Sequence, residues 1–427
     1  MRVNIWVKLF ELLFMKPLKE LVRTNVLNMQ VSDNDSRVRT ESCVWLDRDE
    51  NPYNSPYNRY PDSSMAVLKA SIAKIKNVQT ANVFIANGRY ALVDSMYRCF
   101  CTPGVDNVVI VEPTYDVYRT MAELNCVENR SVLLDADFQL NADRVLEQCD
   151  EKTKLIWLCS PNTPTGIAAN PAEVEVLLEM FDGIVVVDES YVDFSSQLSW
   201  RTRLGKFDNL VVLNTMDNSW GCAAIGVAML YASSELVNML NRVALPFGLN
   251  SLSQKVAIDQ LRDTFEAEKR VRFIILERQR MISAFMDLSI CVQVYPSETN
   301  FLLVKFEDAQ AVYKYLLDKG IVVKNCADMP LCENGLLQGL GNGIDGAHAH
   351  AGGVTAGDLE SDHLGDGLDT MLSGIVAVHD HHIGGGVGGL RGGGSGDLAA
   401  VLSGHEAGLQ AGHLLHGGLQ GAVHLVK

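Results

Sequence analysis

The chain has no long run of lysine or arginine, and its formal net charge over 427 residues is −16. A chain without a basic patch has no electrostatic footprint for a nucleic acid or an anionic membrane surface, so we expect neither as a partner. It also has no apolar stretch long enough to span a bilayer. The opening residues 1–15, MRVNIWVKLFELLFM, are not followed by a small-residue cleavage site, which argues against a signal peptide and favours an amphipathic helical lead-in.

The ten cysteines show none of the paired short spacings that hold zinc. They are scattered, mostly in apolar surroundings such as YRCFC and IWLCSP. This distribution is typical of reduced, partly buried thiols rather than of a disulfide framework. The sequence therefore predicts no metal site and a cytoplasmic protein.

Proline, cysteine and all aromatic residues are missing from the end of the chain. From Gly339 onward there are two basic residues, Arg391 and Lys427, and all ten histidines of the protein. Glycine-rich backbone with so little large apolar surface cannot offset the entropy of ordering, so we expect residues 337–427 to form a disordered, low-complexity tail. Metal binding at residues 379–382 (HDHH) would be adventitious. Translation in a shifted reading frame after Leu336 is one hypothesis for this composition.

Short β-branched apolar runs alternate with helical patterns from about Ala81 to Leu240. The runs are NVFIANG, NVVIVEP, SVLLD, KLIWLCSP, GIVVVDES, NLVVLNT and VAMLYAS. Runs that are apolar throughout are typical of strands covered on both faces, as in parallel sheets flanked by helices. We predict an α/β fold with a mainly parallel central sheet.

A second, smaller unit follows in the sequence. After Leu249 a long stretch has helical periodicity, and the strand-like segments CVQVYPS, TNFLLVKF and IVVK surround the helical AQAVYKYLLDKG. We therefore divide the chain into an N-terminal arm with part of the small domain (1–60), a large α/β domain (61–250), a truncated small α+β domain (251–336) and the tail (337–427). We expect the terminal strand and helices of the small domain to be missing.

Polar residues follow the apolar runs where a parallel sheet presents its carboxyl ends to a crevice. Gly88 opens a turn into a helix, whose free N–H groups suit a phosphate. Tyr115 could stack on a flat heterocycle or could be an ordinary packed tyrosine. Asp188 ends a fully apolar strand, so it needs a cationic partner or several hydrogen bonds, although helix capping alone would explain an acid there.

Five longer motifs carry a closer resemblance. DRDENPYNSPYNRYPD, RCFCTPGVDNVVIVEPTYDVY, LCSPNTPTG, VVVDESYVDF and VYPSETNFLLVKF resemble the histidinol-phosphate aminotransferases, which are pyridoxal-phosphate enzymes of fold type I, across about residues 15–334. The resemblance implies a homodimer that moves an amino group from histidinol phosphate to the 2-oxo acid 2-oxoglutarate in histidine biosynthesis, with pyridoxal 5′-phosphate as cofactor.

The resemblance also implies cofactor-binding roles for six residues. Asp188 would pair with the pyridinium nitrogen, which keeps the ring an electron sink. Tyr191 would donate to the 3′ oxygen, Tyr115 would stack on the ring, and Gly88 and Thr215 would contact the phosphate. Tyr60 would reach the cofactor of the neighbouring subunit.

Several positions depart from the family pattern. The family's Schiff-base lysine falls at Asn218, in the loop NTMDNSWGCAAIG, and an amide nitrogen is neither basic nor nucleophilic. The family's phosphate-binding arginine aligns with Gly226, and the asparagine of the family's NPTG motif aligns with Thr163. The family's arginine that binds the substrate carboxylate aligns with Leu337. Arg89-Tyr90 replaces a small residue and an acid.

Three interpretations follow from these departures. The chain could be an aminotransferase by lineage and by activity. It could be a non-catalytic dimeric scaffold with weakened cofactor binding. It could also be a decayed or frameshifted chain. The lineage favours the first, whereas the site residues predict no catalytic group and no covalent link to the cofactor.

Overall fold

The computed structural model describes residues 16–30 and 48–340, all within one of the two units into which the chain divides, Met1–His379. The expected lead-in helix over residues 1–15, residues 341–427 of the predicted tail and the histidine-rich segment lie outside the described residues. Within the described ranges, none of the helices combines the length and apolarity needed to cross a membrane.

Seven strands form the larger sheet, in the order β1-β7-β6-β5-β4-β2-β3. Their bounds are β1 Val83–Asn87, β2 Asn107–Glu112, β3 Glu128–Leu133, β4 Thr153–Cys159, β5 Ile184–Asp188, β6 Leu210–Thr215 and β7 Val227–Tyr231. Neighbours from β3 to β6 are parallel, and β7 runs opposite to both β6 and β1. The predicted, mainly parallel sheet is confirmed, with every predicted apolar run contributing a strand.

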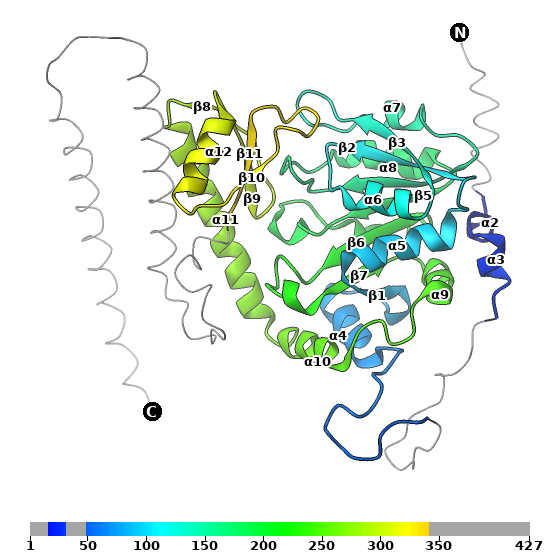
Figure 1. The fold of residues 1–427 in the computed structure, drawn as a ribbon. Coiled ribbons are helices and arrows are strands. Elements are labelled where there is room, and N and C mark those ends of the chain that lie inside the picture. The colour runs from blue at the N-terminus through cyan, green and yellow to red at the C-terminus, as the bar shows by residue number, and fades with distance from the viewer. Residues whose placement is uncertain (1–15, 31–47, 341–427) are drawn as a thin grey trace, which may run out of the picture. The chain divides into compact units, whose positions relative to one another are not determined.

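Helices cover both faces of this sheet (Figure 1). The helices of the α/β part are α2 Leu18–Leu21, α3 Thr24–Leu27, α4 Ala66–Lys76, α5 Gly88–Phe100, α6 Val117–Leu124, α7 Ala142–Leu146, α8 Pro171–Met180, α9 Ser234–Val243 and α10 Ser251–Gln260. Strand side chains alternate between two cores, one shared with α5, α6 and α9 and the other with α4, α7, α8 and α10. Covering both faces is the reason that the strands are apolar throughout.

The long helical stretch after Leu249 forms two helices, α10 and α11 Thr264–Met286. The break lies at Asp263, whose side chain accepts the backbone N–H of Glu266 and so caps α11. Helix α11 leads to the second sheet, which it contacts at β8 and β9. In Figure 1 it runs from the end of α10 to this smaller sheet.

The smaller sheet is antiparallel, in the order β10-β11-β9-β8. Its elements are β8 Cys291–Val294, β9 Phe301–Phe306, α12 Ala309–Asp318, β10 Lys324–Asn325 and β11 Gly335–Gly339. The side chains of Phe285, Leu302, Val304, Leu316 and Leu336 are among those that form its core. The α+β character of this part is therefore as predicted.

Two predictions for the smaller part were wrong. The terminal strand is present, because β11 pairs with both β9 and β10, and Leu336 is buried at 2% exposure. The segment IVVK forms a strand only at its end, since β10 begins at Lys324. The composition change at Leu336 drew the predicted boundary too early: the strand GLLQG is rich in glycine and short, yet its leucines complete the apolar core. The other domain boundaries stay predictions.

Candidate functional site

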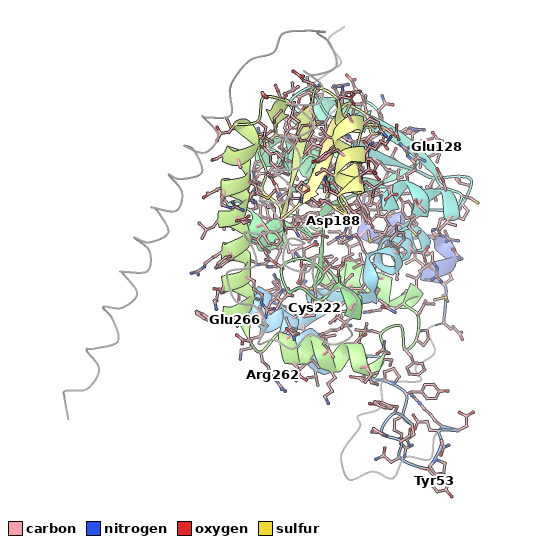
Figure 2. All side chains as sticks on the ribbon, turned by 60° about the vertical axis from the view of Figure 1, so that its left-hand side comes forward. Tyr53, Glu128, Asp188, Cys222, Arg262 and Glu266 are labelled. Atoms are coloured by element: carbon pink, nitrogen blue, oxygen red, sulfur yellow. The ribbon has the colours of Figure 1, made fainter. Side chains whose placement is uncertain are left out.

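Four of the predicted site residues come together at one edge of the large sheet. β1, β2, β4, β5 and β6 run in one direction, so their carboxyl ends share an edge. Gly88 follows β1, Tyr115 follows β2, Asp188 ends β5 and Thr215 ends β6. Asp188 lies in the interior of the protein (Figure 2). Strand alternation directs it to the same face as Ile184 and Val186, which is the face covered by α5 and α6.

The Asp188 carboxylate is fully buried and is satisfied by the chain itself. Its Oδ2 accepts the hydroxyl of Tyr118 at 2.6 Å. Its Oδ1 accepts the backbone N–H of Ser190 at 3.0 Å and the Ser190 hydroxyl at 2.5 Å. A buried carboxylate needs this degree of pairing. The sequence analysis missed Tyr118, which lies in the first turn of α6 and reaches Asp188 only through the packing of that helix on the sheet.

The cationic partner that Asp188 requires is Arg89. The Arg89 Nε lies 3.8 Å from Oδ2 of Asp188, and the Arg89 side chain is only 11% exposed. The guanidinium carbon is 4.9 Å from the centroid of the Tyr115 ring, within the range of a cation–π contact. Burial acts to lower the pKa of Arg89, but the Asp188 carboxylate and the nearby tyrosines raise it above its ordinary value. Arg89 is therefore a permanent cation at the centre of this edge.

Aromatic side chains surround the Arg89 guanidinium. Tyr115 meets Tyr90 edge-on at 6.4 Å and Tyr118 edge-on at 6.3 Å between ring centroids. Burial raises the pKa of Tyr191 to about 12, against the opposing charge of Arg89. Burial also raises the pKa of Tyr118, and Asp188 adds to this effect. These phenols stay neutral at physiological pH and act only as hydrogen-bonding groups.

The loop after β6 places Asn218 next to the end of β5. The Asn218 Nδ2 donates to the backbone carbonyl of Ser190 at 3.1 Å. Ser219 donates to Asp193 at 2.5 Å, and Asp193 in turn accepts from the buried Lys76 at 3.1 Å. The lysine that approaches this loop is therefore already held by a carboxylate, and the Asn218 amide is neither basic nor acidic enough to transfer a proton near neutral pH.

Gly226 lies against the turn that opens α5. Gly226 directly precedes Val227, which is paired with Asn87 where β1 and β7 lie side by side. Its backbone has φ +61°, and a Cβ at Gly226 would lie 2.7 Å from Oδ1 of Asn87. The positive φ disfavours any other residue here, whereas the close Asn87 oxygen is the end of a flexible side chain that can move aside. Gly88, with φ +83°, has no atom within 4 Å of a Cβ position, so its glycine is required by backbone conformation alone.

Two positions, Tyr60 and Leu337, lie apart or lack the expected chemistry, whereas Thr215 lies at the sheet edge with its hydroxyl in a local hydrogen bond. Tyr60 stacks on Phe247 at 5.0 Å, under Arg48, and its backbone N–H donates to Glu50, so within one chain it does not join the Asp188 cluster. Thr215 is buried at the end of β6, where its hydroxyl accepts the backbone N–H of Asp217 at 3.4 Å. Leu337 packs on the apolar core and has no group for a carboxylate.

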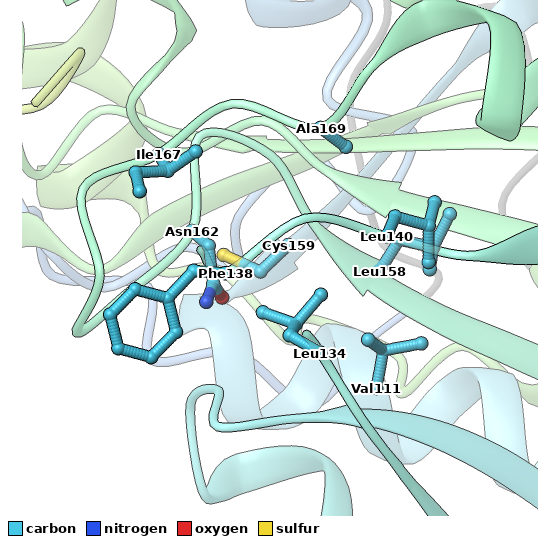
Figure 3. A pocket seen from close by; sticks show the side chains of 9 residues that line it. All are labelled: Val111, Leu134, Phe138, Leu140, Leu158, Cys159, Asn162, Ile167 and Ala169. Atoms are coloured by element: carbon cyan, nitrogen blue, oxygen red, sulfur yellow. The ribbon is translucent and has the colours of Figure 1, made fainter. Parts of the chain in front are cut away.

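A small pocket lies on the face of the large sheet opposite to Asp188. Figure 3 shows its lining side chains. Its lining comprises Val111, Leu134, Phe138, Leu140, Leu158, Cys159, Asn162, Ile167 and Ala169. The Asn162 amide is already bonded to the Pro113 carbonyl at 2.8 Å and to Thr165 at 3.1 Å. Burial raises the pKa of Cys159 to about 12, so its thiol is not a nucleophile at neutral pH. The pocket offers apolar packing rather than chemistry.

Among the described residues there is no group of three or more His, Cys, Asp or Glu side chains that could hold a metal ion.

Comparison with known proteins gives consistent matches. A family model for aminotransferase class I and II matches residues 24–336. The histidinol-phosphate aminotransferase of Bacteroides fragilis is 42% identical over 335 residues, covering 78% of this chain and 97% of the relative. That of Parabacteroides distasonis is 42% identical over 319 residues, covering 74% of this chain and 92% of the relative.

Solved structures share the fold. The histidinol-phosphate aminotransferase from Clostridium acetobutylicum superposes with a TM-score of 0.65 at 18% identity, covering 76% of this chain and 92% of that one. The enzyme from Sinorhizobium meliloti, solved in complex with pyridoxal-5′-phosphate, has a TM-score of 0.65 at 18% identity, covering 77% and 85%. At this identity the likeness establishes the arrangement of the sheet and its helices.

Proposed function

The chain belongs to the aminotransferase class I and II family, and from this premise we propose that it is a histidinol-phosphate aminotransferase by descent that does not transfer amino groups. The observation that carries the proposal is Asn218. Amino-group transfer in this family needs a lysine amine that bonds to the cofactor aldehyde and then moves a proton. The amide of Asn218 is delocalised into its carbonyl, and its N–H is engaged by Ser190.

The residues at the sheet edge do not fit pyridoxal 5′-phosphate as the chain stands. A pyridinium nitrogen would need Asp188, which already has Arg89, Tyr118 and Ser190 as partners. The face of Tyr115 is taken by the Arg89 guanidinium. The phosphate would find only the backbone at Gly88 and the hydroxyl of Thr215, without an arginine at 226. We therefore derive no reaction step through the cofactor.

The expected loss of activity is large. Removal of a covalent catalytic group costs about four to six powers of ten in turnover in other enzymes. Loss of the substrate-carboxylate arginine, which falls at Leu337, adds a penalty of about 2–5 kcal/mol for a buried charge left unpaired. Together these effects support a chain without transamination of histidinol phosphate or any other amino donor.

We propose that the chain instead persists as a non-catalytic dimeric scaffold in the cytoplasm. The dimer is supported by the exposed aromatic arm that carries Tyr60, and the location by the scattered cysteines, which are free thiols throughout the described residues. The competing possibility is a decayed or frameshifted chain. The frameshift possibility is tested by sequencing the transcript across the codon of Leu336 and by mass spectrometry of tail peptides. If the reading frame is confirmed and the tail peptides are found in the protein, the frameshift interpretation fails.

A cofactor assay tests the absence of chemistry. Purified protein is mixed with pyridoxal phosphate, treated with borohydride and digested for peptide mass spectrometry, and in parallel is given histidinol phosphate and 2-oxoglutarate. We expect a colourless protein, no stoichiometric adduct at any lysine, and no glutamate above the protein-free control. A stoichiometric adduct at a single buried lysine, together with glutamate formation, would overturn the proposal.

A further inference from the structure

We propose that Arg89 is a built-in occupant of the cofactor position at the sheet edge, here called the cleft, in which its guanidinium takes the place of a flat cationic ring between Tyr115 and Asp188 and excludes such a ring. This inference deepens the proposed function and rests on it, since it explains why the cleft does not hold the family's cofactor even non-covalently. It concerns exclusion of a ligand, whereas the proposed function concerns the missing amine.

The geometry of Arg89 matches that of a bound pyridinium in two respects. A guanidinium, like a pyridinium, is planar and positively charged, and both are stabilised by an aromatic face and by a carboxylate. Arg89 has both contacts at once, at 4.9 Å from the Tyr115 centroid and 3.8 Å from Asp188. A second planar cation could use the same two groups only after displacing Arg89.

Displacing Arg89 is unfavourable because the site is buried. The side chain is 11% exposed, its Nε is buried without a hydrogen-bond partner among the described residues, and Asp188, Tyr115 and the Tyr191 hydroxyl act on the guanidinium. A ring that took over Asp188 and Tyr115 would strip the buried Arg89 guanidinium of the two contacts that stabilise its charge, which is unfavourable. A ligand would have to compensate for this loss before it gained any affinity.

The start of α5 directs Arg89 into the cleft. Gly88 adopts φ +83° at the end of β1, which turns the chain so that residue 89 is in the first helical turn and close to Asp188 on β5. Tyr90 contacts Tyr115 edge-on and so braces the ring on which Arg89 lies. A small residue at 89 would leave the space of the guanidinium open.

Titration with pyridoxamine 5′-phosphate tests this inference. This probe has the ring and phosphate but no aldehyde, so its binding is independent of any lysine. Isothermal titration is performed on the full chain and on Arg89→Ser, Arg89→Gln and Arg98→Ser. Arg98 is the matched control, because it lies on the same helix, is 40% exposed and pairs with the surface carboxylate of Asp94.

We expect no saturable binding of pyridoxamine 5′-phosphate to the wild type or to Arg98→Ser. Arg89→Ser should bind it saturably, with a dissociation constant at least tenfold below any wild-type limit, and adding Asp188→Asn should abolish this binding. One-to-one binding to the wild type, or no gain in folded Arg89→Ser and Arg89→Gln, would overturn the inference. Circular dichroism establishes folding. If both variants unfold, the wild-type titration decides, since binding there contradicts exclusion and its absence supports it.

These results separate the two proposals. Saturable binding of pyridoxamine phosphate by the wild type, without an adduct or product glutamate in the cofactor assay, would overturn exclusion by Arg89 and leave the absence of transamination standing. Glutamate formation by the wild type would overturn the proposed function.

Discussion

At the scale of single residues, the site is defined by how Asp188 finds its partners. The sequence predicts that an acid at the end of an apolar strand needs a cation, and it offers a bound ring as one source. Arg89 is the other source, and it was visible in the sequence only as a departure from the family turn. The sequence could not show that Arg89 is the partner of Asp188, because a residue in the first turn of α5 comes close to β5 only in the folded chain.

The pairing of Asp188 predicts a large effect on stability. Asp188→Asn removes the charge that Arg89 faces and should lower the free energy of unfolding by about 3–5 kcal/mol, because it leaves a buried cation unpaired. Urea denaturation followed by circular dichroism measures it. Glu128→Gln is the control, since Glu128 is 63% exposed in its pair with Arg130 and should contribute less than about 1 kcal/mol. Equal effects of the two substitutions would contradict the pairing.

Restoring the family lysine should require removal of Arg89. Asn218→Lys alone places an amine beside a ring position that is already filled, so we expect no yellow colour with pyridoxal phosphate. Asn218→Lys combined with Arg89→Ser should give a yellow protein with an absorption band at the violet end of the visible spectrum. Borohydride should then trap an adduct at residue 218, identified by peptide mass spectrometry. An adduct at Lys76 instead would show that the buried pair with Asp193 does not hold that amine.

At the scale of secondary-structure elements, the large sheet was predictable and the small one only in part. Runs such as GIVVVDES are apolar throughout because helices cover both faces, so their pattern is strong. The strand GLLQG is short and glycine-rich, and only pairing with β9 and β10 makes it a strand. Tertiary pairing of that kind leaves no local signal. The same reason explains the late start of β10 after the apolar IVV.

The site was predictable to the level of positions rather than contacts. Strand ends located Gly88, Tyr115 and Asp188 at one edge, and the family resemblance identified Thr215 and position 218. The contact of Tyr118 with Asp188 depends on how α6 packs on the sheet, which a single sequence does not encode in any local pattern. Tyr60 belongs to a different surface of the chain, and its predicted role needs a second subunit.

Glu189, between β5 and the 3₁₀ turn Val192–Phe194, makes the free energy of unfolding depend on pH. Burial raises the pKa of Glu189 to about 7, while bonds from Ser199 and the Trp200 N–H act against the rise. Since the folded pKa exceeds the unfolded one, the folded state binds more protons between pH 4.5 and 7, and stability falls as pH rises through this window.

This contribution amounts to about 3 kcal/mol for a shift of this size. Glu189→Gln should flatten the decline in the free energy of unfolding between pH 4.5 and 7, measured by urea denaturation at each pH. Arg201 and Asp193 lie near enough to influence the same carboxyl, with opposite signs. A decline of unchanged steepness in the variant would show that Glu189 is not its source.

At the scale of the whole molecule, the arm over residues 48–62 suggests how two chains associate. It has no helix or strand, yet Arg59 and the Tyr60 N–H are both bound to Glu50, so its course is fixed. Tyr53, Tyr57 and Tyr60 are 82%, 68% and 48% exposed. In Figure 2, Tyr53 lies at the far end of this arm from Asp188. Exposed aromatic residues on an ordered segment are typical of an interface.

We therefore expect the protein to sediment at twice its chain mass of 46.9 kDa. Aromatic anchors commonly dominate interface energies, so the double substitution Tyr53→Ser with Tyr57→Ser should weaken the dimer by about 10- to 100-fold in Kd, measured by sedimentation across a dilution series. Leu198→Ser is the control, because Leu198 is 85% exposed but lies outside the arm. A monomeric wild type at micromolar concentration, or equal dissociation of the control, would exclude an arm-mediated dimer.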